Sequence, residues 1–384
     1  MIDTSRHFVE VDDILRLLDA MSAAKLNRLH VHATDSTAWT LESDAYPELA
    51  QEGSWSRSSA TTYSKSQITE IVQRGRDRFV DVIFELDTPA HTLSIARSHP
   101  EMMAECWKWM AESGFKVDVD SDDTMALNPV SSDARVMVKT LIGEIADLTA
   151  SRYVHIGGDE VKYACWDSID EIREHVQTVY GNNSDVAYAR LQAEWTANVT
   201  AAAVTLKKKI PVLWQPTTKG YGDPVWDNAL PSESVYMVWL NADSAASYAK
   251  HKRNVVYTTP YYVAGMGAAG GFLNVYNAQL MPTSLTSEQQ KYILGGQICA
   301  WGESMAGGSM GMDFRALTIG AGAAETFWRE HESGTSPSQA SGLGLGDRYN
   351  RFLCHVRRFG VDTIPVMPSY CAVLNITSTI DIIA

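Results

Sequence analysis

Short apolar segments alternate along the chain with longer segments in which apolar residues recur every three or four positions. The first pattern is typical of buried β-strands and the second of amphipathic α-helices. Eight strands are expected, at 2–8, 26–32, 79–86, 153–156, 210–214, 235–239, 254–258 and 296–301. The main helices are expected at about 11–24, 66–76, 134–148, 185–207 and 347–358.

This alternation predicts the α/β fold class. Strands separated by helical crossovers pair in parallel, and eight of them close most naturally into a single (β/α)8 TIM barrel rather than an open sheet. The chain has 384 residues, enough for one such barrel, and no repeat, low-complexity segment or linker divides it. We expect one domain over 1–384, with a polar excursion at 92–132 and a C-terminal helix and tail, about 342–384, packed on the barrel.

The composition of the chain argues against some classes of binding partner. The chain carries a net charge of −14, which argues against nucleic acid and against an anionic membrane surface. No apolar run is long enough to span a bilayer, so we expect no membrane span. The eleven tryptophans and sixteen tyrosines suit sugar binding, although core packing accounts for most aromatic residues taken singly. The sequence runs from Met1 directly into strand-like residues without a signal peptide, which by itself predicts a cytoplasmic protein.

The stretch with the clearest chemical character is 153–160, a short strand followed by two glycines and then by Asp159 and Glu160. The glycines allow a sharp turn at the carboxyl end of the strand, the edge at which parallel α/β proteins bind ligands. Adjacent carboxyl groups resist ionising together, so one of them keeps its proton to higher pH and can protonate a leaving group. The alternative is that Asp159 caps the next helix and Glu160 is a solvated first-turn residue.

Polar and aromatic residues recur at the carboxyl ends of all eight predicted strands, where barrel enzymes carry their chemistry. Together they describe a site walled by tryptophans, with carboxylates and an arginine at its floor, which suits one pyranose ring. The strand-end residues are Arg6, His7, His30, His32, Asp35, Asp87, His91, Asp159, Glu160, Trp214, Trp239, Tyr262, Trp301 and Glu303.

Two other interpretations of the histidines remain open at this point. His30 and His32 could be core residues whose buried nitrogens have found hydrogen-bond partners. A zinc-dependent hydrolase is the second interpretation, since imidazole and carboxylate groups are zinc ligands. Its ligands would be His30, His32, Asp35 and His91.

Five motifs give the sequence a resemblance to a known family. They are DTSRHF at 3–8, LHVH at 29–32 followed by Thr34 and Asp35, DTPAHT at 87–92, HIGGDEV at 155–161 and CAWGE at 299–303. On these motifs the chain resembles the catalytic domain of the β-N-acetylhexosaminidases of glycoside hydrolase family 20, closest in type to the eukaryotic lysosomal and secreted enzymes. The resemblance covers essentially the whole chain. It implies an exo-acting hydrolase of terminal, non-reducing β-linked GlcNAc or GalNAc.

The resemblance implies a role for each of five catalytic residues. Glu160 would be the general acid and base, and Asp159 would hold the N–H of the substrate's 2-acetamido group. Tyr262 would hydrogen-bond the acetamido oxygen, which is itself the nucleophile, so that an oxazoline forms and the anomeric configuration is retained. Asp35 and His91 would form a relay behind Glu160 that tunes its proton affinity.

The resemblance also implies how the sugar would be held. Arg6 would bind the outer hydroxyl groups of the ring, and Glu303 would assist it. The side chains around the sugar and its acetamido group would be Trp214, Trp239, Trp301 and His155. Neither a cofactor nor a metal is implied. The expected partner is a glycan that ends in an amino sugar, and self-association into a homodimer is a further expectation.

The five cysteines fit the family's eukaryotic members. In those members cysteines placed like Cys106 and Cys165 are bridged, as are those like Cys354 and Cys371, and Cys299 would stay free. Two disulfides imply an oxidising compartment, either secreted or the lysosomal or vacuolar lumen. Sequons starting at Asn182, Asn198 and Asn375 give weak support for a secreted glycoprotein. The family normally carries a small α/β domain ahead of the barrel, and we expect that domain to be missing here, since the sequence starts at the first predicted barrel strand.

The sequence departs from the family pattern at several positions near the expected site. The departures are Val31, Ser36, Ala90, Pro216 and Ala264. Ala264 is the most serious, because the family has an acid or amide there that contacts the outer hydroxyl groups of the sugar. A lost hydrogen bond of this kind is worth about 0.5–1.5 kcal/mol of binding. The alternative function is therefore a catalytically weakened or inactive sugar-binding homologue.

Overall fold

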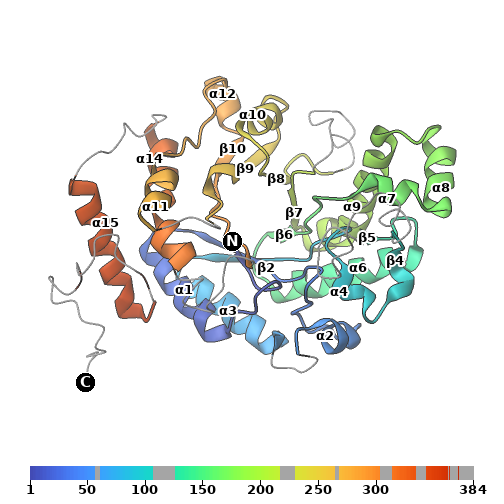
Figure 1. The fold of residues 1–384 in the computed structure, drawn as a ribbon, viewed down its shortest axis with the longest axis horizontal. Coiled ribbons are helices and arrows are strands. Elements are labelled where there is room, and N and C mark those ends of the chain that lie inside the picture. Colours follow the sequence, from blue (N-terminus) through green and yellow to red (C-terminus); the bar gives the residue numbers. More distant parts are fainter. Residues whose placement is uncertain are drawn as a thin grey trace.

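A computed structural model of the chain describes residues 1–56, 61–106, 126–216, 230–263, 268–302, 314–333, 343–361, 363 and 371. Its centre is one sheet of eight parallel strands in the order β1-β2-β3-β6-β7-β8-β9-β10 (Figure 1). A parallel bridge between Ile2 and Ala300 joins β1 to the residues that follow β10, so the sheet closes on itself. The predicted α/β barrel is therefore confirmed. Its strands are β1 (Ile2–Asp3), β2 (Arg28–His32), β3 (Asp81–Glu85), β6 (Tyr153–His155), β7 (Ile210–Trp214), β8 (Val235–Val238), β9 (Asn254–Tyr257) and β10 (Ile293–Gly296).

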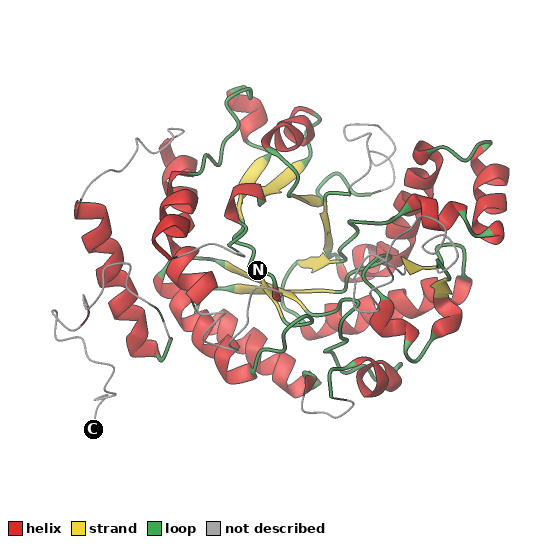
Figure 2. Cartoon of the chain, viewed as in Figure 1, coloured by secondary structure: helices red, strands yellow, loops and turns green. Residues whose placement is uncertain are grey.

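Helices surround the ring of strands (Figure 2). A two-stranded antiparallel ribbon, β4 (Met103–Ala104) with β5 (Ala126–Leu127), lies in the excursion between β3 and β6. The α-helices are α1 (Val11–Ala23), α2 (Pro47–Gly53), α3 (Lys65–Asp77), α4 (Leu93–Ala96), α6 (Ser132–Leu148), α7 (Tyr163–Asp167), α8 (Asp170–Tyr180), α9 (Asp185–Lys207), α10 (Ala242–Lys250), α11 (Ala268–Asn277), α12 (Ser287–Gln290), α14 (Ala321–Ser333) and α15 (Leu343–Val356). Short 3-10 or π turns occupy Pro100–Met102, Thr259–Tyr261, Phe314–Ile319 and Arg357–Phe359.

A side-chain cap starts five of the described helices, α3, α6, α9, α10 and α12. The Ser64 side chain accepts a hydrogen bond from the backbone of Gln67, whose own side chain accepts one from the backbone of Ser64 in return, and this capping box starts α3. In α1 the residues Leu17 and Leu18 are fully buried with their apolar neighbours, as the helical spacing predicted. Helix α9 matches the predicted range 185–207.

Of the eight predicted strand ranges, only 210–214 matches the structure to the residue, four differ by one or two residues at one end, and three differ more. Strand β1 ends at Asp3 rather than continuing to residue 8, because Asp3 Oδ1 accepts hydrogen bonds from the backbone N–H groups of Ser5 and Arg6, both at 3.0 Å, and turns the chain. Phe79 lies outside β3, with a φ of 57° and 91% of its side chain exposed. The last strand is Ile293–Gly296, so the predicted range 296–301 begins where the regular strand ends.

The cysteine pairing implied by the resemblance is present. Cys106 is bonded to Cys165, Cys354 is bonded to Cys371, and Cys299 is a buried free thiol. Helix α15 packs on α11 and α14, where the ring of Tyr349 stacks on that of Phe272 with centroids 3.8 Å apart. No helix in the described ranges is both long and apolar enough to cross a membrane.

Candidate active site

The turn after β6 brings the backbone against the end of β3. Gly157 has a φ of 66°, and a Cβ atom there would lie 1.5 Å from Asp87 Oδ1. The same Asp87 oxygen accepts a hydrogen bond of 3.1 Å from the backbone N–H of Gly158. Only glycine meets both the backbone angle and the lack of space at position 157. This contact fixes where Asp159 and Glu160 leave the strand.

Glu160 faces a histidine that comes from the neighbouring strand end. Its Oε2 lies 3.2 Å from His91 Nε2, and His91 Nδ1 lies 3.8 Å from Asp35 Oδ1, which is an ion-pair distance longer than a hydrogen bond. His91 and Asp35 are buried, whereas the Glu160 side chain is 34% exposed. The structure thus brings together the three residues that were predicted to form a relay. Glu160 is the one of these three residues that solvent can reach.

The two adjacent carboxyl groups have pKa values that differ in a direction the sequence did not predict. Burial, with the negative charges of Glu160 and Glu85 nearby, raises the pKa of Asp159 to about 7. The hydrogen bond with His91 lowers the pKa of Glu160, against the effect of its partial burial. One carboxyl group does keep its proton to higher pH, but it is Asp159 rather than the predicted proton donor.

Arg6 connects the start of the barrel to this relay. Its guanidinium lies 2.8 Å from Asp35 Oδ2 and 3.1 Å from Asp3 Oδ2, and it is stacked over the Trp301 ring at 5.2 Å from the centroid. Although burial alone would favour the neutral acid, the charges of Arg6 and His91 hold the pKa of Asp35 well below its usual range. Asp3, which the sequence analysis did not single out, also accepts a 3.0 Å hydrogen bond from the backbone of Gly302.

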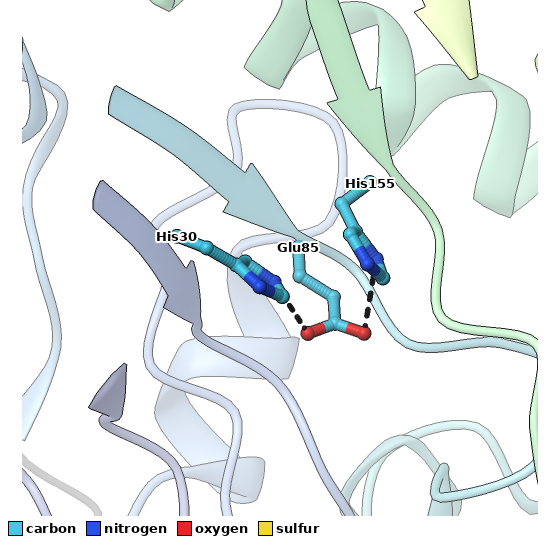
Figure 3. Close-up of side chains that lie close together, drawn as sticks. All are labelled: His30, Glu85 and His155. Atoms are coloured by element: carbon cyan, nitrogen blue, oxygen red, sulfur yellow. Dashed lines mark hydrogen bonds and ion pairs between the residues drawn. The ribbon is translucent and has the colours of Figure 1, made fainter. Parts of the chain in front are cut away.

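Glu85 is the important residue that sequence reasoning missed. It is fully buried at the end of β3, and its carboxylate lies between His30 and His155, as Figure 3 shows. Its Oε1 accepts a 2.6 Å hydrogen bond from the indole of Trp214 and lies 3.1 Å from His155 Nδ1. Despite burial, the surrounding histidine charges hold the pKa of Glu85 well below its usual range. A single acid inside the apolar run 82–86 was the available signal, because a buried charge needs partners.

The structure places the predicted sugar-binding residues at different depths. Trp239 and Trp301 are half-buried, and so is Tyr262, whose ring centroid lies 6.1 Å from that of Trp301. Trp214 and His155 expose none of their side chains, and both contact Glu85. Glu303 and Ala264 lie outside the described residues.

The histidine-rich interior also contains groups of possible metal ligands. His30 and His32 do not share a compact set of ligand atoms with Asp35 and His91. Instead, the described residues form three overlapping sets, which are His30–Glu85–His155, His32–Glu85–Asp87 and Asp35–Asp87–His91. His30 Nε2 already lies 2.8 Å from Glu85 Oε2, and burial, with the charge of His155, lowers the pKa of His30 to about 3. The four residues of the alternative zinc site therefore divide among separate sets, and the imidazoles of His30 and His32 lie within hydrogen-bond distance of the Glu85 carboxylate.

A cavity of about 270 Å³ lies at the opposite end of the barrel, among the first residues of the strands and the inner faces of α1 and α14. Its walls are mainly apolar, and the described residues that line it include no carboxylate. It therefore lacks the carboxyl groups that gather at the carboxyl ends of the strands, where barrel enzymes carry their chemistry.

Sequence comparison is decisive for the family. A sequence profile described as glycosyl hydrolase family 20, catalytic domain, matches residues 1–331. This chain belongs to that family. It is 27% identical to the β-hexosaminidase subunit beta of Felis catus over 384 residues, and 26% identical to that of Homo sapiens over 382 residues. Each alignment covers 97% of this chain but only 65% and 62% of the relative, so the chain spans less than two thirds of their length.

Solved structures agree on the fold. The Flavobacterium johnsoniae chitobiase superposes with a TM-score of 0.76 at 23% identity, over 94% of this chain and 52% of that one. The GH20 exo β-N-acetylglucosaminidase from Vibrio harveyi, in complex with N-acetylglucosamine, gives a TM-score of 0.74 at 20% identity, over 96% and 58%. The family resemblance drawn from the five motifs is confirmed.

Proposed function

We propose that this chain is the catalytic part of an exo-acting β-N-acetylhexosaminidase, which removes terminal β-linked GlcNAc or GalNAc from glycoconjugates. Family membership supports this proposal, and the state of Asp159 is the observation that carries it. Asp159 Oδ1 is buried without a hydrogen-bond partner among the described residues, next to the partly exposed Glu160. A buried acceptor without a donor is costly. The acetamido N–H of such a sugar is a donor that would satisfy it.

In the first step the acetamido carbonyl oxygen attacks the anomeric carbon while the bond from that carbon to the leaving oxygen breaks. The Glu160 carboxyl proton passes to the leaving oxygen, so the aglycone departs as a neutral alcohol. The sugar becomes an oxazolinium, and the Asp159 carboxylate accepts the hydrogen bond from its N–H. Tyr262 donates its hydroxyl proton in a hydrogen bond to the acetamido oxygen and so orients it for attack.

In the second step the Glu160 carboxylate takes a proton from water while the water oxygen adds to the anomeric carbon. The bond between that carbon and the acetamido oxygen breaks, which restores the acetamido group and returns the proton to Glu160. Two inversions at one carbon leave the β configuration unchanged. Asp159 and Glu160 are sequence neighbours, so they do not flank both faces of the sugar, which agrees with a nucleophile supplied by the substrate.

A bound substrate would lower the pKa of Asp159 and raise the pKa of Glu160, which would reverse their order. The acetamido N–H would stabilise the charged form of Asp159, and a bound sugar would cover the exposed third of Glu160 and favour its neutral form. The single proton that the pair shares would then reside on Glu160. Arg6 would bind the outer hydroxyl groups together with Glu303, and the faces of Trp239 and Trp301 would stack against the sugar.

The proposal also covers the compartment in which the enzyme acts. Two disulfides suit an oxidising compartment, so we place the protein in the lysosomal or vacuolar lumen or outside the cell. Residues 1–384 would act as one catalytic domain, with the C-terminal helix packed on the barrel; most of the tail after residue 361 lies outside the described residues. Of the two sequon asparagines within the described residues, Asn182 is exposed and accessible for glycosylation, whereas Asn198 lies within α9; Asn375 lies outside the described residues. A homodimer remains a prediction that sedimentation analysis would test.

The experiment that tests the proposal is release of chromophore from aryl β-GlcNAc and β-GalNAc substrates, with and without a thiazoline that mimics the oxazoline. We expect turnover with retention of configuration and inhibition by the thiazoline. Folded protein that binds GlcNAc tightly without turning over either substrate would instead identify an inactive sugar-binding homologue. Activity that disappears on chelation would contradict the proposed chemistry in favour of a metal hydrolase.

A further inference from the structure

His32 lies between two buried carboxylates that belong to different parts of the barrel. Its Nδ1 lies 2.6 Å from Glu85 Oε2, and its Nε2 lies 2.8 Å from Asp35 Oδ2. Carboxylates only accept hydrogen bonds, so both ring nitrogens must carry a proton, and the ring is an imidazolium. Although burial opposes a charge, the two acids hold the pKa of His32 well above its usual range.

The orientation of Asp35 follows from this contact. His32 Nε2 and the Arg6 guanidinium each lie 2.8 Å from Asp35 Oδ2. Asp35 Oδ1 accepts a 2.5 Å hydrogen bond from the backbone N–H of Ser36. Oδ1 is consequently the oxygen turned toward His91. The carboxylate that faces His91 is thus fixed from behind by His32.

Charges of alternating sign therefore run through the interior from Glu85 to Glu160. The order is Glu85, His32, Asp35, His91 and Glu160, and the first four are buried. Opposite charges in contact within a low-dielectric interior interact strongly, so a change at one end of this series alters the next member. His32 and Asp35 are three residues apart, whereas the other contacts join β2, β3 and the segments that follow β2, β3 and β6.

We propose that His32 and Glu85 are positioning residues for the proton donor Glu160, acting through Asp35 and His91. This inference rests on the proposed function. Neither residue has a route to the sugar, since His32 and Glu85 expose almost none of their side chains. Their part is to hold Asp35 so that His91 faces Glu160, because a misplaced catalytic group can cost about a hundredfold in rate.

His30 provides a matched control within the same cluster. Its Nε2 lies 2.8 Å from the same Glu85 oxygen that His32 contacts, but its Nδ1 lies 3.3 Å from Gln297 Oε1 rather than near Asp35. Substitution of either histidine removes one donor from Glu85. Only substitution of His32 also breaks the connection to Asp35.

The kinetic experiment compares His32→Gln with His30→Gln on aryl β-N-acetylglucosaminides whose leaving phenols span a range of pKa values. Poor leaving groups need the proton from Glu160, and strongly activated ones do not. We expect His32→Gln to lower kcat/KM by about a hundredfold for the poorest leaving group and far less for the best. His30→Gln should keep the leaving-group dependence of the unsubstituted chain. Equal losses across the series for His32→Gln, or the same altered slope in both variants, would overturn the inference.

A second measurement needs neither turnover nor a variant at His32. Nitrogen NMR of histidine-labelled full-length chain, with the His32 ring assigned through its bonded carbons, reports whether both nitrogens carry protons. We expect the imidazolium to persist at about pH 8, above the ordinary histidine pKa of about 6.5, and to be lost in Glu85→Gln. A neutral His32 ring at neutral pH would refute the inference even if the chain hydrolyses substrate. A persistent imidazolium in a folded chain without turnover would instead count against the proposed function alone.

Discussion

His91 Nε2 and Glu160 Oε2 meet at 3.2 Å, and both residues hold a left-handed backbone, with φ of 57° and 53°. Outside glycine this conformation costs of order 1–3 kcal/mol and persists only where its surroundings enforce it. The other non-glycine residues with positive φ in the described chain follow the ends of helices, where the conformation is common; they are Lys25, Phe79, Lys208 and Lys252. The two that do not follow a helix are the pair that meets here.

The first prediction concerns Glu160. Replacing it with glutamine keeps the shape of the side chain but removes the transferable proton, so kcat should fall by about 10²- to 10⁴-fold. Initial rates on a substrate with a poor leaving group measure this. Glu70→Gln, an exposed acid in α3, is the control and should retain full activity. Normal turnover by Glu160→Gln would exclude Glu160 as the acid.

The second prediction concerns pH. Between the lowered pKa of Glu160 and the pKa of Asp159, about 7, the pair holds one proton, and the reaction requires that state. The kcat/KM profile should therefore be bell-shaped. It should fall as pH rises through about 7, when the pair loses its last proton, and fall again below the Glu160 pKa, when a second proton binds.

Asp159→Asn provides the check on that assignment. Glu160 then titrates alone, so the alkaline limb of the residual activity should move from near pH 7 toward the lower pKa of Glu160. His91 does not complicate this range, because the charges of Asp35 and Asp87 outweigh its burial and hold the His91 pKa well above its ordinary value. An alkaline limb that stays near pH 7 would show that another group sets it.

The third prediction concerns the turn after β6. Gly157→Ala adds a Cβ atom 1.5 Å from Asp87 Oδ1 in a backbone with a φ of 66°. The left-handed backbone costs about 1–2 kcal/mol and the overlap about 1–3 kcal/mol, so the free energy of unfolding should drop by about 2–5 kcal/mol. Denaturant unfolding measures the drop. In Gly143→Ala the new atom meets nothing within 4 Å in α6, and that variant should be stabilised by about 0.5–1 kcal/mol.

The fourth prediction concerns Tyr262. Tyr262→Phe removes one hydrogen bond to the acetamido oxygen, worth about 0.5–1.5 kcal/mol, so kcat/KM should fall about two- to tenfold. Affinity for the thiazoline, measured by calorimetry, should fall by a similar factor. The neighbouring Tyr261 is buried, and its hydroxyl lies 3.4 Å from the backbone oxygen of Ala278, so Tyr261→Phe should leave thiazoline affinity unchanged. Equal effects of the two variants would point to a general disturbance of this segment.

The pattern of apolar and polar residues along the chain was sufficient to predict the helices and strands of the barrel. Apolar periodicity located α9 and the strand Ile210–Trp214 to the residue, because both are long or uniformly apolar and have clear ends. It failed for Phe79 and for the first strand, since a side-chain hydrogen bond or a turn after a helix can end an apolar run. The Gly-Gly-Asp-Glu sequence indicated where the carboxylates would lie, because the barrel fixes which end of each strand carries chemistry.

By itself the sequence determined the order of the elements and the adjacent pair Asp159 and Glu160, since both follow from neighbours along the chain. Only the tertiary structure decided that Glu85 meets Trp214, 129 residues away, and that His32 joins Glu85 to Asp35. It also decided that the pKa of Asp159, rather than that of Glu160, is raised. A pKa depends on burial and on charges within a few ångströms, and closure of the barrel sets both for residues that lie far apart in sequence.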